Sequence, residues 1–235
     1  MGAGAKGWTG SSAGRGGGSA IALALAAFLL ALAIPTSAAA FPETSPELST
    51  RWCETGAGAG QCKIPRGIAA DPRNGHVFVV DQQNFRIAES NALGEFISAW
   101  GWDVVQSGPG NAGTGLETCE PDSGDVCKVG TVGGGTGQLS ELAMGAAVDS
   151  AGDVYVTDRG FLGNPSVRVQ KYSPNGQFLL MFGGEVNKTK VEAGGASEAE
   201  ENLCPFDPGD QCQKGAIGTG AGQFQFQTAL DAAEL

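Results

Sequence analysis

Short apolar runs separated by turn residues dominate the chain between about residues 60 and 185. The runs Val77–Val80 and Val154–Val156 consist of β-branched and aromatic residues, a composition typical of strands. Asn74-Gly75, Ala151-Gly152 and Asn175-Gly176 separate such runs, and glycine supplies the positive φ that tight hairpin turns need. The pattern therefore predicts antiparallel β-hairpins.

The same ordered set of motifs occurs twice. The first copy reads Gly67-Ile-Ala-Ala-Asp71, Val77-Phe-Val-Val-Asp81, Phe85-Arg86-Ile87, Leu93-Gly94-Glu-Phe96 and Trp100-Gly101. The second copy reads Met144-Gly-Ala-Ala-Val-Asp149, Val154-Tyr-Val-Thr-Asp158, Val167-Arg168-Val169, Asn175-Gly176-Gln-Phe178 and Phe182-Gly183. Four short apolar runs given twice predict a repeated four-stranded sheet. One such sheet buries too little surface to be stable alone, so we expect the copies to stack as blades of a β-propeller.

At these residues the chain resembles the NHL-repeat β-propellers, whose units carry the same motifs in the same order. A lead-in of the same family type appears as Gly135-Thr-Gly137-Gln138-Leu139 and again as Gly220-Ala-Gly222-Gln223-Phe224, where it announces a third blade. After it only Thr228-Ala-Leu-Asp231 remains, as a damaged match to the expected first strand. The resemblance covers about Cys53 to Phe226 and implies an all-β fold, a partial propeller with blades of four antiparallel strands.

The resemblance also implies the domain organisation. A partial propeller over residues 41–235 follows a signal peptide at 1–40. We expect its parts to be blade 1 at about 63–101, a disulfide insertion at 102–134, blade 2 at about 135–184, a second insertion at 185–217, and the start of blade 3 at 218–235.

In blades of this type we expect an Asp at the end of the second strand to hydrogen-bond to an Arg at the start of the third. These residues are Asp81 and Arg86 in blade 1, and Asp158 and Arg168 in blade 2. The first pair is five residues apart and the second is ten, because blade 2 has an insertion at 160–165. Whether Arg168 keeps the place of Arg86 is open at this point.

The N-terminus has the layout of a secretory signal. Lys6 and Arg15 precede an apolar run over residues 21–34, and Ala38-Ala39-Ala40 forms a cleavage site. The run is shorter than the roughly 20 residues of a membrane span, although an uncleaved anchor is the alternative. No later segment has the pattern of a membrane span. We therefore expect a secreted or cell-surface protein.

Charge argues against nucleic acid as a partner. Signal removal takes away Lys6 and Arg15 and no acidic residue, so the 14 basic side chains fall to 12 against 25 acidic ones. Binding to phosphates needs clustered Lys and Arg, which this chain lacks.

The six cysteines fall as local pairs: Cys53 with Cys62, Cys119 with Cys127, and Cys204 with Cys212. The last two pairs enclose seven residues each and lie eleven residues before Gln138 and Gln223, which gives a repeat period of 85 residues. In an exported chain such pairs predict disulfides. Zinc is the alternative, but its sites favour two to four residues between paired cysteines and need further ligands.

Two of the cysteine rings contain a matching acidic turn. Asp122 and Asp125 lie in one, and Asp207 and Asp210 in the other. Oxygen-rich loops hold calcium, which makes these four residues weak calcium candidates, but two carboxylates fall short of the six to eight oxygens that calcium takes. Asp, Pro and Gly are also the residues that a tight turn selects.

Catalysis has little support in the sequence. His76 is the only histidine, and its place in the Asn74-Gly75 hairpin predicts an exposed turn residue. We therefore expect a binding or scaffolding module whose partner, a protein or a carbohydrate, contacts the cysteine-ring loops. The alternative is a calcium-dependent hydrolase of the lactonase type, or a lyase, active only in a complete ring.

Two blades and part of a third do not close a propeller, so we expect a fragment completed by further blades, or an arc that assembles with other chains.

One insertion has a distinctive composition. The stretch 188–202 has almost no large apolar residue and four glutamates, which predicts a solvated or disordered loop. Asn187-Lys-Thr189 matches a glycosylation sequon, which we interpret as a chance match.

Overall fold

The computed structural model describes residues 52–161 and 163–225. The predicted signal peptide at 1–40 and the damaged third-blade motif at 228–231 lie outside the described residues. Among the residues that are described, no helix is long and apolar enough to cross a membrane.

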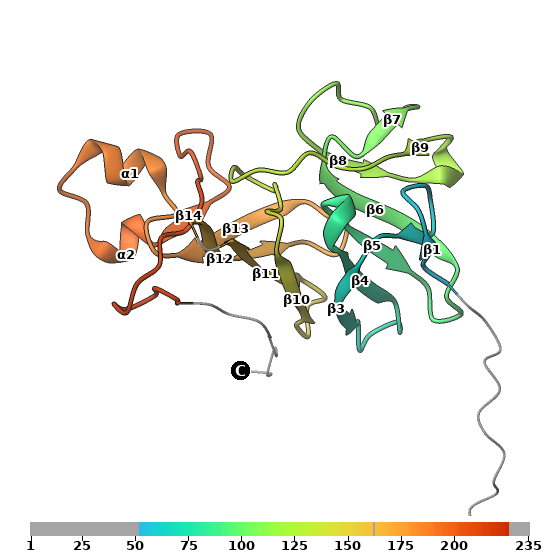
Figure 1. Cartoon of the computed structure of the whole chain (residues 1–235), viewed down its shortest axis with the longest axis horizontal. Coiled ribbons are helices and arrows are strands. Elements are labelled where there is room, and N and C mark those ends of the chain that lie inside the picture. Colours follow the sequence, from blue (N-terminus) through green and yellow to red (C-terminus); the bar gives the residue numbers. More distant parts are fainter. Residues whose placement is uncertain (1–51, 162, 226–235) are drawn as a thin grey trace, which may run out of the picture. The chain divides into compact units, whose positions relative to one another are not determined.

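The first sheet is an antiparallel meander with one added strand. Its strand order is β3-β4-β5-β6-β8 (Figure 1). The bounds are β3 Pro65–Ala70, β4 Val77–Asp81, β5 Arg86–Ser90, β6 Phe96–Trp102 and β8 Leu116–Cys119. A short 3-10 helix, η1 (Gln82–Asn84), links β4 to β5.

The second sheet repeats this plan, with the order β10-β11-β12-β13-β14. The bounds are β10 Ala143–Val148, β11 Val154–Phe161, β12 Asn164–Tyr172, β13 Phe178–Gly183 and β14 Leu203–Pro205. All neighbouring strands in both sheets are antiparallel. The mostly β, antiparallel character predicted from the sequence is confirmed.

The strand registers of the two sheets match residue by residue. Asp81 pairs with Arg86 in the first sheet, and Asp158 pairs with Arg168 in the second. The extra residues of the second copy extend the β11–β12 hairpin, with a register shift between Asp158 and Gly160. Arg168 therefore occupies the place of Arg86 despite the longer spacing in sequence.

Each sheet has five strands where the hydrophobic pattern predicts four. The extra strands β8 and β14 come from the insertions and carry the first cysteine of a ring, Cys119 or Cys204. They pair with the outer strands β6 and β13. Runs of three or four residues without clear alternation give too weak a signal to be recognised as strands.

The remaining short strands lie before the first sheet and in the first insertion. Strands β1 (Glu54–Thr55) and β2 (Gln61–Cys62) pair before the first sheet, and β7 (Val105–Ser107) pairs with β9 (Val126–Cys127). A 3-10 helix, η2 (Pro121–Ser123), precedes β9.

The second insertion contains two helices, so the prediction of a loop at 188–202 is wrong in its secondary structure. The same stretch is mostly exposed, as predicted for a solvated segment. Helix α1 spans Lys188–Ala193 and helix α2 spans Glu198–Glu201. Asn187 caps α1, and Ser197 forms a capping box with Glu200 at the start of α2. Caps satisfy free backbone N–H groups without any apolar residue, which is why composition alone gave the wrong expectation.

The two sheets stack over one shared apolar core. Phe78, Ile87 and Trp100 from the first sheet and Val156 and Met181 from the second are all buried in it. The inner strands β3 and β10 approach so closely that a Cβ on Gly67 would lie 2.7 Å from the backbone nitrogen of Ala146. Figure 1 shows these two strands side by side. The two copies therefore meet along their inner strands and share one apolar core.

Candidate functional site

A fully buried arginine holds together three segments of the first repeat. Arg86 donates from Nε to Asp81 Oδ2 at 3.0 Å. Its terminal nitrogens donate to four carbonyl oxygens, at distances of 2.8 to 3.1 Å, from Ala57, Gly58, Gln61 and Lys128. Since a guanidinium has five N–H groups, every donor of Arg86 has an acceptor.

The second repeat contains the same arrangement. Arg168 donates to Asp158 Oδ2 at 3.1 Å from Nε and 2.9 Å from a terminal nitrogen. It also donates to the carbonyls of Gly134, Gln138 and Gln213, the last two at 2.7 and 3.1 Å. Gln138 and Gln213 lie where Gln61 and Lys128 lie in the first repeat. We call each set, an Asp–Arg pair with its carbonyl acceptors, a clamp.

The charged side chains of both clamps are fully buried and paired with each other. Burial raises the pKa of the Asp81 and Asp158 carboxyls, and the neighbouring arginine opposes that rise. Burial also lowers the pKa of the Arg86 guanidinium, against the pull of Asp81. All four side chains have no exposed surface, so none of them faces a substrate.

In each clamp the arginine donates to carbonyls of a tight turn that ends in a glutamine and precedes the sheet. We call this segment the glutamine turn. The Oε1 atom of Gln61 accepts a hydrogen bond from the Gly58 nitrogen, and Gln138 accepts one from Gly135. From the sequence, this motif was predicted only at residues 135–139 and 220–224. The first copy, Gly58-Ala-Gly60-Gln61, was missed because cysteine follows it in place of Leu or Phe, although the four preceding positions carry the signal.

All three predicted disulfides are confirmed. They join Cys53 to Cys62, Cys119 to Cys127, and Cys204 to Cys212, with Cα atoms 4.9, 5.6 and 5.7 Å apart. The Cys119–Cys127 bond joins β8 to β9. Three disulfides indicate an oxidising, extracytoplasmic environment.

The acidic turns in the rings are built from hydrogen bonds. Asp125 accepts hydrogen bonds from the backbone nitrogens of Gly110 and Glu120, at 2.8 and 3.1 Å. These bonds lower the pKa of the Asp125 carboxyl, and the bond from Gly110 has the largest effect. Asp210 accepts from Asn187 Nδ2 at 2.9 Å. Asp122 and Asp207 are exposed, and Asp207 accepts from the nitrogen of Gly209. Within residues 52–161 and 163–225 no three acidic, histidine or cysteine side chains form a group that could hold a metal.

Two other residues singled out in the sequence have structural partners. His76 is half-buried, and its Nδ1 lies 2.8 Å from Glu89 Oε1, so the prediction of an exposed turn residue is wrong. The cause is that His76 precedes β4, next to β5, and not the tip of the turn. Asn187 is buried, and its side chain caps α1 and donates to Asp210, which leaves no access for a glycan.

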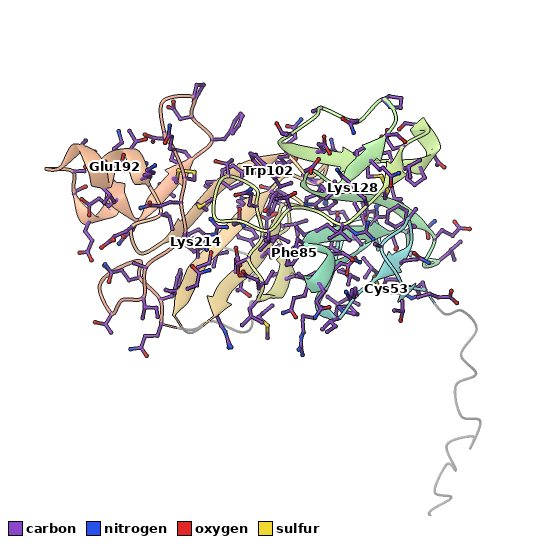
Figure 2. The ribbon with its side chains drawn as sticks, turned by 45° about the horizontal axis from the view of Figure 1, so that its top comes forward. Cys53, Phe85, Trp102, Lys128, Glu192 and Lys214 are labelled. Atoms are coloured by element: carbon purple, nitrogen blue, oxygen red, sulfur yellow. A yellow bond between two sulfur atoms is a disulfide. The ribbon has the colours of Figure 1, made fainter. Side chains whose placement is uncertain are left out.

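A cleft of about 710 Å³ opens where the two repeats meet. Its lining comes from both insertions, from the second glutamine turn and from the β12–β13 turn: Trp102, Gly115, Leu116, Thr136, Gln177, Phe178, Leu179 and Phe206. Figure 2 shows Trp102 where the ribbons of the two sheets meet. Phe206 lies inside the Cys204–Cys212 ring, and Leu116 lies just before Cys119.

The chemistry of the cleft is apolar and aromatic. Phe206 is 72% exposed, which is unusual for a large aromatic side chain, while Trp102 and Leu116 are half-buried. Thr136 and Gln177 supply hydroxyl and amide groups, and none of the lining residues is ionisable. A concave apolar surface with a few polar groups at its edge is the usual form of a binding site.

Comparison with known proteins does not identify a family: no protein-family model matches this chain, and neither does any curated protein.

Proposed function

We propose that this chain is a portion of an exported NHL-type β-propeller that acts as a binding or scaffolding module, with the inter-repeat cleft as its binding surface. The observation that carries the proposal is the composition of that cleft. Both cysteine-ring insertions contribute to it, and they meet there only because the two sheets stack. A repeat unit of constant framework with variable, disulfide-held insertions is suited to presenting a binding surface.

The propeller assignment has its support in the repeated geometry. Each sheet contains a four-stranded meander with one added outer strand, each carries the same Asp–Arg clamp, and the sheets share one apolar core. Stacking of this kind buries apolar faces that a single sheet would leave in water. The three disulfides and the predicted signal peptide support export.

Binding explains the site better than catalysis does. The buried Asp and Arg side chains are engaged in the clamps, and the cleft lining carries no ionisable side chain to act as acid, base or nucleophile. The calcium-dependent hydrolase or lyase alternative lacks a comparable observation, since Asp125 and Asp210 accept hydrogen bonds from backbone and amide donors.

The lining favours a protein partner that inserts an aromatic or aliphatic side chain. Large apolar side chains in a concave, desolvated site are the features of interface hot spots. Thr136 and Gln177 would then bind the polar backbone of the inserted segment. A carbohydrate is the second partner class to be tested, because a sugar ring stacks on aromatic side chains such as Trp102 and Phe206.

The experiment is a selection of displayed random peptides against the oxidised chain, with a panel of soluble oligosaccharides as the second ligand class. We expect peptides with an aromatic anchor, and at least tenfold weaker binding to the Phe206→Ala variant. Leu93→Ala is the matched control, because Leu93 is 73% exposed and lies outside the cleft. Binding that is equal in both variants would place the site elsewhere.

A further inference from the structure

The turn at residues 218–224 is a third copy of the two turns that the clamps hold. The central glycines have nearly the same positive φ, +69°, +71° and +73°, at Gly60, Gly137 and Gly222. In each turn the glutamine nitrogen donates to a glycine carbonyl at 3.2 Å, as in the pair Gln223 and Gly220. The glutamine Oε1 accepts from the same glycine's nitrogen in all three copies.

The third turn differs from the others in what binds its carbonyls. In the first two copies an arginine donates to the carbonyl of the glutamine and to that of a residue four positions earlier: Ala57 and Gln61 in one, Gly134 and Gln138 in the other. The equivalents are Thr219 and Gln223. Among the described residues, no side chain donates to either of these two carbonyls.

The sheet face beside the third turn is also partly open. Trp100 of β6 is fully buried, beneath the second sheet. Its counterpart by register is Phe182 of β13, which is partly exposed. Phe182 contacts Phe224 of the third turn, with ring centroids 6.0 Å apart. The third turn is thus already seated on the face that, in the first sheet, the next sheet covers.

From these two observations we infer that the 218–224 turn is a preformed receptor for a guanidinium group, carried by the Asp–Arg hairpin of a further repeat. The same repeat would cover the open face of the second sheet around Phe182. This inference rests on the proposed repeat scaffold and names the partner of one of its surfaces.

A second copy of this chain does not fit the receptor. The five N–H groups of Arg86 all have acceptors within its own repeat. Its own turn at residues 56–62 also occupies the place that the 218–224 turn would have to take. The receptor therefore requires an arginine hairpin that does not already hold a glutamine turn.

The test extends the chain after Phe224 with a second copy of residues 140–217, which carries its own Asp158, Arg168 and disulfide. The matched variant has Arg168→Met in the added copy alone. Hydrogen exchange of the amides at residues 218–224 is measured in the unextended chain, the extended chain and the variant, all oxidised. We expect exchange at least tenfold slower after extension, and loss of that gain in the variant.

Two results would overturn the inference: no slowing after extension, or equal slowing in the Arg168→Met copy. If the extended chain does not fold, the unextended chain still provides a test, because its 218–224 amides should exchange at least tenfold faster than those at 133–139. Equal rates would mean that the receptor is already occupied. Concentration-dependent dimers that protect 218–224 would identify a second copy as the occupant and also refute the inference. None of these readouts depends on peptide binding in the cleft, so failure of either proposal is distinguishable.

Discussion

Replacing Arg86 by Met tests whether the clamp holds the first repeat together. The change keeps a long side chain in the site but removes the guanidinium. It leaves the Asp81 carboxylate buried without its cation, and it takes one donor from each of four carbonyls, of which that of Gly58 keeps the Gln61 nitrogen.

The expected loss is large. Removing one partner of a buried ion pair typically costs about 3–5 kcal/mol. Each carbonyl left without a donor in this partly buried site adds to that, by up to about 1–3 kcal/mol before relaxation and water entry. We therefore expect the free energy of unfolding of Arg86→Met to fall by at least about 4 kcal/mol, a large part of the roughly 5–15 kcal/mol of a typical domain.

Urea unfolding of the oxidised chain measures the loss, with Arg66→Met as the control. Arg66 lies exposed on the neighbouring strand β3, so its replacement should change stability by no more than about 0.5 kcal/mol. Adding Asp81→Asn to Arg86→Met removes the unpaired charge and should recover about 2 kcal/mol.

The sign of the pH dependence follows from the buried carboxyl. Burial raises the pKa of Asp81 against hydrogen bonds from the Lys63 nitrogen and the Asn84 amide and against the charge of Arg86, and Arg86→Met removes the last of these opposing groups. Between the ordinary pKa and the raised one, the folded state binds more protons than the unfolded state, so stability falls as pH rises. The deficit of Arg86→Met should be larger at pH 7 than at pH 4.5. A loss under 1 kcal/mol, or a deficit independent of pH, would refute the reasoning.

Three further predictions concern single positions, and stability is again measured by urea unfolding of the oxidised chain. Gly176→Ala should lower the free energy of unfolding by at least about 2 kcal/mol, because φ is +76° and a Cβ would lie 2.6 Å from Trp100 Cγ. Gly163→Ala is the control: its φ of +94° is strained but the space around it is open, so the loss should be only about 1 kcal/mol. Hydrogen bonds, first of all that from the Gly110 nitrogen, hold the pKa of the Asp125 carboxyl below its ordinary value, so the Cys119–Cys127 ring should lose stability as pH falls through that lowered pKa. At that low pH the Gly110 amide should exchange faster relative to neighbouring amides, and Asp125→Asn should abolish this change. Asn187→Ala should cost about 1–2 kcal/mol through the lost helix cap, while Asn187 of the native chain should carry no glycan by intact mass in a glycosylating host.

Much of the framework is predictable from the sequence because local chemistry determines it. Alternating apolar runs and Asn-Gly or Ala-Gly turns specify the meander strands, and the even spacing of cysteines specifies the rings. The motif order also gave the Asp81–Arg86 and Asp158–Arg168 pairs as candidates for a hydrogen bond across the hairpin, which the structure contains in both sheets.

The remainder depends on contacts between segments far apart in the sequence. Strand β8 is recognisable only once β6 offers it an edge, and Arg86 binds Lys128 only because the first insertion returns to the clamp. The sequence predicted only that a partner contacts the cysteine-ring loops, and it did not predict a cleft. Trp102, Thr136 and Phe206 have no shared motif, and only the stacking of the two sheets brings them together.

The shared core predicts that the two repeats form one cooperative unit, and native-state hydrogen exchange of the oxidised chain tests this most directly. The decisive amides are those of the two arginine strands, β5 at Ile87 and β12 at Val169, which lie in equivalent, buried positions. The shared core predicts that both amides exchange through the same global unfolding, with opening free energies equal to within about 1 kcal/mol. Opening free energies that differ by several kcal/mol would mean that the sheets unfold independently, and would contradict the stacked-repeat account.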